Sequence, residues 1–272
     1  FNTIINLKFY ILLFCAMLSW GISWSNAKIL GEYFPPTTIM FWRFLFSSIS
    51  LIPFLFFIKF EMDKIKSQAI KLILASTLLC FYNYCYFKGT QIGLAGIGGV
   101  LVTTLMPIIT TIITIIIYKN KIHLNIKLGI LLGVFSGILL LKLWQYDLNQ
   151  LFKNGNIYFI LGAFSWSILT LVTQSITKEI PSIIFSIIIF SISTLIIFLT
   201  NPKTANAQFF ISDLRFWVHF LSVTIGAMSF GTVAYFYATQ KLGATIASSF
   251  TFLVPVSAII FSIILLNEIP DI

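Results

Sequence analysis

Long apolar runs separated by short polar segments recur along nearly the whole chain. A bilayer core about 30 Å thick needs about 20 apolar residues per helix, so these runs predict nine membrane-spanning helices. We place the spans at residues 9–29, 36–58, 70–89, 94–117, 126–143, 156–177, 181–200, 216–236 and 243–266. The runs are continuous rather than alternating, which favours helices over barrel strands. The predicted fold class is therefore an all-α polytopic membrane protein.

Part of the sequence occurs twice. Residues 90–117 and 239–266 both begin with Thr-Gln, pass through small residues to Met-Pro or Val-Pro, and end in an apolar run. Ser19-Trp20 matches Ser165-Trp166 in the same way. The repeating unit is five spans long, and the two copies are residues 1–145 and 146–272. Because an odd number of spans reverses the second copy across the membrane, the sequence predicts two inverted five-helix repeats, an architecture typical of secondary transporters.

The second copy has four spans here, because the sequence ends soon after residue 266; it also begins with Phe1 rather than Met. We therefore expect a ten-helix bundle whose tenth span is missing from this chain. In the span at 126–143, Gly129, Gly133 and Gly137 form one face of small residues, which lets helices approach closely in lipid. We expect this face to pack against the tenth helix or a second copy in a homodimer, unless it only reflects how common Gly is in membrane helices.

Composition agrees with the membrane assignment. Hydrophobic residues make up 58% of the chain, charged residues make up 9%, and the mean hydropathy is +1.00. A soluble domain has about 25% charged residues. The net charge of +9 comes largely from lysines in short loops, so it indicates membrane topology and no nucleic-acid partner. Ten basic residues fall in the loops on the side of the membrane that carries the N-terminus, and six fall on the other side. Because basic loops favour the cytoplasm, we expect a cytoplasmic N-terminus, and we expect the membrane to be a bacterial cytoplasmic (inner) membrane.

A polar stripe follows one face of the span at 70–89. Its members are spaced seven, three and four residues apart: Ser76, Asn83, Tyr86 and Thr90. The repeat places Thr232 and Tyr235 at the positions equivalent to Asn83 and Tyr86. We expect these two pairs to bind substrate in a cavity, because a phenol offers apolar surface and one hydrogen bond. The alternative is that they only bond neighbouring helices together.

Two further pairs occupy equivalent positions in the repeats. Trp20 and Trp166 are candidate substrate-binding residues as walls of the cavity, with tight packing as the alternative. Pro107 and Pro255 interrupt their spans at matching points. Since each removes a helix hydrogen bond and can kink its helix, we expect both to act as hinges.

Basic residues near the outer ends of spans are further candidates for substrate contact. Arg43 lies inside an apolar run, about 10 Å from its outer end, and no Asp or Glu of the sequence falls mid-membrane to pair with it. It anchors helices, contacts substrate or reaches the interface. Together with Lys28 and Lys88 it would make an outer vestibule positive and favour anionic solutes, although a lysine at a span end more often only reaches the interface.

The sequence contains no motif typical of an enzyme. It has no Gly-rich phosphate loop, no His-Glu-x-x-His motif and no carboxylate pair, and its cysteines lack metal-ligand spacing. We predict no catalytic residue, no metal and no cofactor. Because no carboxylate or His lies deep within a span to relay protons, we expect facilitated diffusion or exchange.

Several short motifs follow one another in a specific order. In the first repeat they are Trp20-Gly21, Asn26-Ala27-Lys28, Pro35-Pro36 and Phe41-Trp42-Arg43-Phe44-Leu45; in the second they are Ala238, Ala244 to Ala247, Leu253-Val254-Pro255 and Leu266-Asn267-Glu268. This order resembles the EamA family of the drug/metabolite transporter superfamily over essentially the whole chain. The resemblance implies a ten-helix bundle whose central cavity moves small metabolites by alternating access. The chain departs from the pattern at Asn120, where the first repeat would carry an acid equivalent to Glu268, and in its absent last helix.

We therefore expect a secondary transporter for a small organic metabolite such as an amino acid. One alternative is an uptake carrier for an anionic metabolite or a nucleotide-like cofactor. The alternative from another class is a non-transporting membrane scaffold, which needs no polar stripe in both repeats. Asn83→Leu combined with Tyr86→Phe would then disable a carrier and leave a scaffold working.

Overall fold

The computed structural model describes residues 2–118, 124–140 and 155–268, and these residues form helices and no strand. The helices of the first half are α1 (Asn2–Leu30), α2 (Pro36–Leu51), α3 (Met62–Ser67), α4 (Ala69–Ile92), α5 (Ala95–Tyr118) and α6 (Leu124–Leu140). Those of the second half are α8 (Asn156–Ile176), α9 (Ser182–Thr200), α10 (Leu214–Leu221), α11 (Val233–Leu242), α12 (Ala244–Ser249) and α13 (Val254–Leu266). The predicted all-α fold class is confirmed.

Short helices of other types extend or join these elements. A 3₁₀ segment, η1 (Ile52–Phe57), continues α2, and a π-helix, η5 (Ser222–Thr232), joins α10 to α11. A second 3₁₀ segment, η6 (Phe250–Leu253), joins α12 to α13. The 3₁₀ segments η3 (Pro202–Thr204) and η4 (Ala207–Ile211) lie between α9 and α10.

Eight helical stretches of the described residues are long and apolar enough to cross a membrane. They match eight of the nine predicted spans, including the composite stretches Leu214–Leu242 and Ala244–Leu266. The ninth prediction, at 126–143, corresponds to α6, whose apolar part Lys127–Leu139 is shorter than a full span. The chain is thus a multi-pass membrane protein, while its division into two five-helix repeats stays a prediction.

Local sequence explains where several helices begin and end. Pro36 stands at the first turn of α2, where its missing N–H costs nothing. Gly93 ends α4 in an extended conformation. The carboxylate of Asp213 accepts a hydrogen bond from the backbone N–H of Phe216 at 2.8 Å and so caps α10.

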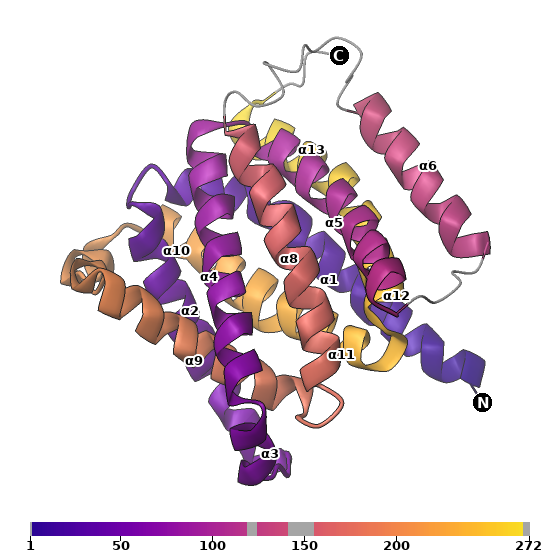
Figure 1. Cartoon of the computed structure of the whole chain (residues 1–272). Coiled ribbons are helices and arrows are strands. Elements are labelled where there is room, and N and C mark those ends of the chain that lie inside the picture. The colour runs from indigo at the N-terminus through magenta and orange to yellow at the C-terminus, as the bar shows by residue number, and fades with distance from the viewer. Residues whose placement is uncertain (1, 119–123, 141–154, 269–272) are drawn as a thin grey trace.

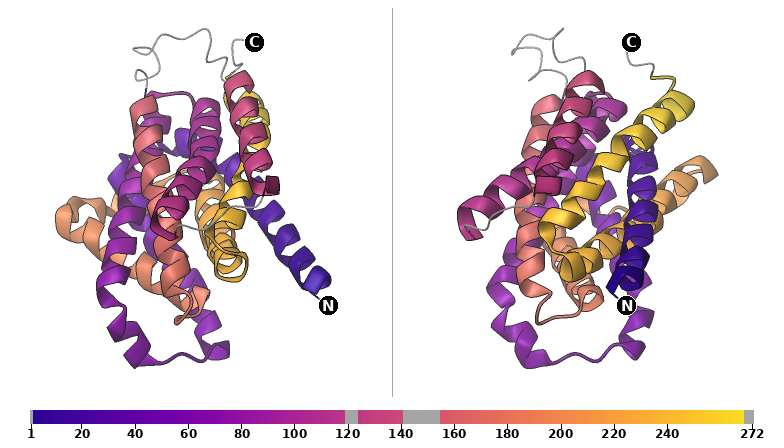
Figure 2. Two further views of the ribbon diagram at one scale, coloured as in Figure 1. Left: turned by 45° about the vertical axis from the view of Figure 1, so that its right-hand side comes forward. Right: turned by 90° about the vertical axis from the view of Figure 1, so that its right-hand side faces the viewer.

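Helices from the two halves of the chain pack against one another throughout the bundle (Figure 1). The helix α4 lies beside α8 and α9, α2 lies beside α9, and α1 lies beside α13 and the π-helix. Figure 2 shows α1 and α13 crossing at one side of the bundle. The interior is rich in aromatic rings, among them fully buried Phe44, Phe159 and Phe236. Neither half of the chain forms a separate core, so a site in the interior is built from residues of both halves.

The face of small residues on α6 is directed largely at the chain itself. A Cβ atom at Gly133 would lie 2.3 Å from the Phe252 ring, and one at Gly137 would lie 2.6 Å from the Thr104 side chain. Gly129 has nothing within 4 Å of that position. Two of the three glycines predicted to face another helix therefore already have intramolecular partners, and the homodimer stays a prediction that now rests on Gly129.

Candidate functional site

A small cavity of about 20 Å³ lies in the interior where both halves of the chain meet. Helices α1, α2, α4, α5, α8 and the π-helix contribute its lining, which consists of Trp20, Ser23, Trp24, Arg43, Leu79, Tyr82, Asn83, Tyr86, Thr103, Trp166, Met228 and Thr232. Six of the eight predicted substrate-binding residues are in this set. A space of this size holds about one water molecule, so the cavity is closed around a polar centre in this conformation.

Arg43 is the one charged residue in this lining, and it is 6% exposed. Its Nη1 atom donates a hydrogen bond to Oδ1 of Asn83 at 2.7 Å. The guanidinium carbon lies 5.5 Å from the centre of the Tyr86 ring and 5.4 Å from that of Phe87, within the range of cation–π attraction. Its Nε atom is buried without a hydrogen-bond partner. Arg43 therefore tethers α2 to α4 and keeps unused donor capacity inside the protein.

The polar stripe on α4 divides into two kinds of residue. Asn83 and Tyr86 line the cavity, and the Tyr86 hydroxyl donates to the Ser23 carbonyl at 2.6 Å. Ser76 and Thr90 are buried outside the cavity and donate to carbonyls of their own helix. Asn83 and Tyr86 thus bond helices together and also face the cavity, and their binding of substrate stays a prediction.

Trp20 and Trp166 meet in the cavity wall. Their ring centroids are 5.1 Å apart in an edge-to-face arrangement, and the Trp20 Nε1 donates to the Ala227 carbonyl at 3.0 Å. Tyr235 lies behind them, fully buried, with its ring centroid 5.1 Å from that of Trp20 and its hydroxyl 3.1 Å from Oγ1 of Thr170. Tyr235 therefore supports the wall and is not in the cavity lining, contrary to its predicted equivalence with Tyr86.

Sequence reasoning missed Tyr82 and Trp24, which both line the cavity. The Tyr82 ring centroid is 4.5 Å from that of Trp166, and the Trp24 ring centroid is 4.7 Å from that of Tyr86. Helical spacing carried a signal for each of them. Tyr82 stands four residues before Tyr86, and Trp24 stands four residues after Trp20, so each shares a helix face with a predicted residue.

The π-helix exposes backbone carbonyls to the first half of the chain. Ser19 and Trp20 donate to the carbonyls of Gly226 and Ala227 at 2.9 and 3.0 Å, and Ser47 donates to that of Thr224 at 3.3 Å. A π-helical turn leaves the regular bonding pattern and occurs frequently at functional sites. Here the hydrogen bonds attach the π-helix to α1 and α2 beside the cavity.

A much larger cavity, about 960 Å³, lies between the halves at the end of the bundle that carries α3 and the α8–α9 connection. Its lining is mainly apolar and includes Leu51, Ile183 and Phe230, with Lys178 and Lys241 among the charged members. Loop lysines predict that this end faces the cytoplasm. The large and small cavities are neighbours along the π-helix, where Met228 and Thr232 line the small one and Ser229 lines the large one.

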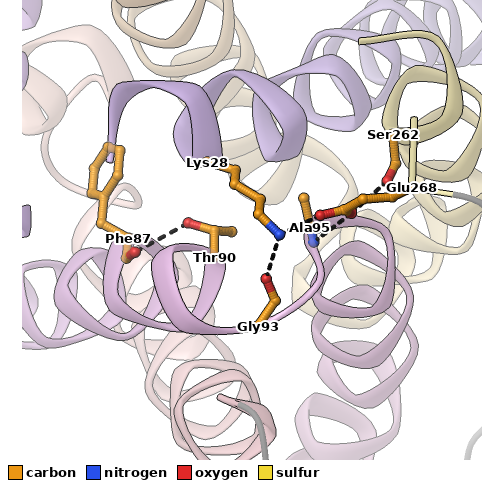
Figure 3. A network of polar contacts seen from close by, with 7 residues as sticks. All are labelled: Lys28, Phe87, Thr90, Gly93, Ala95, Ser262 and Glu268. Carbon is orange, nitrogen blue, oxygen red and sulfur yellow. Dashed lines mark hydrogen bonds and ion pairs between the residues drawn. The ribbon is translucent and has the colours of Figure 1, made fainter. Parts of the chain in front are cut away.

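The opposite end of the bundle is held by a polar network that joins both halves (Figure 3). Lys28 forms an ion pair with Glu268 and donates to the Gly93 carbonyl at 2.9 Å. Glu268 Oε2 accepts from the backbone N–H of Ala95 at 3.0 Å and from the Ser262 hydroxyl at 2.7 Å. Ala95 begins α5, so the carboxylate also satisfies a free N–H at the positive end of that helix.

The structure separates the three basic residues that were predicted to form an outer vestibule. Lys28 is neutralised by Glu268, while Arg43 lies in the interior. Lys88 lines a different hollow of about 360 Å³, together with Glu32 and Gln91. These cations therefore do not act together, and Lys88 has no contact with the interior cavity.

The two predicted hinge residues differ in setting. Pro107 lies inside a continuous α5, whereas Pro255 is the second residue of α13, which follows the 3₁₀ segment η6 directly. Their role as hinges stays a prediction. In the described residues no group of three or more His, Cys, Asp or Glu side chains is placed to hold a metal ion.

Comparison with known proteins agrees with this architecture. A model of the EamA-like transporter family matches residues 7–142 and 153–272. Two uncharacterized transporters of Bacillus subtilis are similar: YetK is 24% identical over 95% of this chain and 80% of its own length, and YyaM is 23% identical over 94% and 86%. A WAT1-related chloroplastic protein of Arabidopsis thaliana is 27% identical over 70% of this chain and 46% of its own length. A solved crystal structure has the same fold, with a TM-score of 0.71 at 15% identity over 97% of this chain and 90% of that one. The chain belongs to the EamA-like transporter family.

Proposed function

We propose that the protein is a secondary transporter that moves a small organic metabolite across the bacterial cytoplasmic membrane by alternating access. The observation that carries this proposal is the contrast between the two ends of the bundle. One end contains the 960 Å³ cavity between the halves, and the other is joined by Lys28, Glu268 and the start of α5. The small closed cavity lies between these two ends. In the proposed mechanism a solute would be bound there while both ends are closed.

The lining of the small cavity supports a carrier driven by its solute gradients. No Asp, Glu or His is among the residues that line it, so it offers no group for a proton relay. This lining supports facilitated diffusion or exchange as the proposed mechanism. A transport rate that rises steeply with an imposed pH gradient, at controlled net charge movement, would contradict this mechanism.

A counterflow assay tests the transporter proposal. The full protein is reconstituted in liposomes preloaded with unlabelled amino acids, organic acids or nucleotide cofactors, and each labelled solute is offered outside at trace level. We expect transient accumulation of at least one small solute. If no labelled solute accumulates although insertion of folded protein has been verified, the membrane scaffold would be favoured instead.

Tyr82→Phe is expected to weaken this transport without unfolding the protein. The Tyr82 hydroxyl has no hydrogen-bond partner among the described residues, although the side chain lines the cavity. Losing one hydrogen bond to solute costs about 0.5–1.5 kcal/mol, which raises KM roughly 2–10-fold. Tyr84→Phe is the matched control, because Tyr84 is on the same helix, is 38% exposed and lies outside the cavity. An unchanged KM for Tyr82→Phe would contradict a hydrogen bond between the solute and this hydroxyl.

A further inference from the structure

Arg43 places a permanent positive charge in the apolar interior, where it has no counter-ion among the residues that the structure describes. It is the eighth residue of α2, about 10 Å along the helix from its start. The ion pairs of the described residues join Lys28 to Glu268, Lys64 to Glu61, Lys66 to Asp63 and Arg215 to Glu32, and none includes Arg43. A buried unpaired charge costs several kcal/mol, which the surrounding contacts reduce only in part.

Within the described part of the chain, neutral groups supply the hydrogen bond and the cation–π contacts of Arg43. Asn83 offers one amide oxygen, and the faces of Tyr86 and Phe87 offer weak cation–π attraction. The Nε atom is left without any partner although it is buried. The guanidinium group is therefore held in position by Asn83 with part of its donor fork unused, beside the small cavity that six helices line.

We infer that the transported solute carries a carboxylate, and that this group binds the guanidinium of Arg43 in the small cavity. The inference rests on the proposed transport function and names its substrate class. A carboxylate accepts two parallel hydrogen bonds from an Arg fork, and it would neutralise the buried charge while it is bound. The free cation then disfavours a closed cavity without solute, which couples closure to loading.

The surroundings of Arg43 limit the anion to one negative charge and an apolar body. A phosphate dianion needs a second cation, but Lys28 is paired with Glu268 and Lys88 lines a separate hollow. The remaining lining is dominated by rings, including Trp20, Tyr82 and Trp166, which suit an aliphatic or aromatic side chain. The same ring faces would accept an ammonium group, so amino acids and 2-oxo acids share the predicted chemistry.

One flexible side chain lines the small cavity from the π-helix. Met228 and Thr232 line the small cavity, Ser229 of the same helix lines the large one, and Met228 is 1% exposed. An unbranched Met side chain changes rotamer easily, so it can yield to an entering solute. The 20 Å³ available now is too small for a carboxylate with its side chain, which means that binding requires this wall to open.

Matched solutes test the inference on the wild-type protein. Reconstituted full-length protein is offered leucine, leucinamide and 4-methyl-2-oxopentanoate, and the corresponding set built on phenylalanine. Counterflow is measured together with quenching of tryptophan fluorescence, which reports binding directly because Trp20, Trp24 and Trp166 line the cavity. We expect each acid to bind at least tenfold more tightly than its amide. Preference for leucine over the oxo acid identifies amino acids as the source of the carboxylate, and the reverse preference identifies oxo acids.

Variants of Arg43 separate binding from helix anchoring. Arg43→Gln is expected to lose the discrimination between acid and amide, and Arg43→Lys is expected to keep part of it. Arg215→Gln removes an exposed cation that is paired with Glu32 outside the cavity, and it should behave as wild type. If Arg43 only anchored α2 to α4, Arg43→Gln and Asn83→Ala would both be expected to lower stability, and Arg43→Gln would leave the discrimination intact.

The outcomes distinguish this inference from the transporter proposal. Counterflow of amides at the same rate as acids would leave transport standing and overturn the role of Arg43. Retained discrimination in Arg43→Gln would overturn it as well. If no member of the panel exchanges or quenches fluorescence, the proposed function fails together with the inference.

Discussion

Gly21→Ala and Gly99→Ala are each expected to destabilise the protein by about 1–3 kcal/mol, as overpacking of a close contact does. A Cβ atom at Gly99 would lie 2.5 Å from the Cβ of Ala258, and one at Gly21 would lie 1.9 Å from Oγ of Ser257. These contacts join α1 and α5 of the first half to α13 of the second, where small residues allow close approach. Alanine favours a helix over glycine by about 1 kcal/mol, which offsets only part of the clash.

Thermal unfolding in detergent measures this effect. A loss of about 2 kcal/mol corresponds to a fall in Tm of roughly 4–8 °C for a chain of this size. Gly129→Ala is the control, because nothing lies within 4 Å of its added Cβ, and its Tm should equal or exceed that of the wild type, since alanine favours the helix. The swap Gly99→Ala with Ala258→Gly removes the atom that causes the clash and is expected to recover most of the loss. Equal Tm values for Gly99→Ala and Gly129→Ala would contradict the packing of α5 on α13.

The spans were predictable because lipid imposes one requirement on every helix that crosses it. A length of about 20 apolar residues is local information, and eight predicted spans correspond to helices of the structure. The cavity lining was predictable in part for the same reason. Asn83 and Tyr86 share a helix face, and their polar groups stand out in an apolar span.

What the sequence did not reveal depends on contacts between distant residues. The π-helix at Ser222–Thr232 is bonded to side chains of α1 and α2, and no propensity within those eleven residues distinguishes it from an α-helix. Tyr235 matches Tyr86 along the chain, yet the packing of Trp20 and Trp166 in front of it removes it from the lining. The depth of a residue in the membrane can be predicted from the hydropathy of its span. Whether its side chain points into the cavity depends on how six helices pack, which the sequence does not show.

The pairing of Lys28 with Glu268 was equally beyond sequence reasoning, since 240 positions separate the two residues. The interpretation of Lys28 as part of a positive vestibule was wrong because a carboxylate from the other half neutralises it. Two glutamines at matching positions of the predicted repeat make similar contacts, while the inverted repeat itself stays a prediction. Gln91 donates to the Gly31 carbonyl at one end, and Gln240 donates to the Thr177 carbonyl at the other.

Glu268→Gln is expected to release the end of the bundle that the Lys28 network closes. The mutation keeps an acceptor for Ala95 and Ser262 but removes the charge that pairs with Lys28. Charge-assisted hydrogen bonds contribute about 1.5–3 kcal/mol, and the side chains here are 28% and 12% exposed, which reduces that figure. A remaining loss of about 1.4 kcal/mol would make the open conformation roughly ten times more populated.

Accessibility of a buried position next to the network measures that opening. Thr90 is fully buried near Lys28, so Thr90→Cys is introduced after Cys15, Cys80 and Cys85 are replaced by Ala. A membrane-impermeant maleimide added from the predicted outer side should then label Glu268→Gln about tenfold faster than its parent. Glu32→Gln breaks an exposed pair with Arg215 and should leave the rate unchanged.

A double-mutant cycle decides whether the ion pair itself closes this end. Lys28→Met combined with Glu268→Gln should label no faster than the faster single variant, because both changes remove the same interaction. Rates that multiply would mean that Lys28 and Glu268 act independently, and an unchanged rate in Glu268→Gln would mean that another contact holds the end closed. Coupling of the two residues would instead show that an ion pair across the two halves sets the balance between the closed end and the end that contains the large cavity, which is the property that alternating access requires.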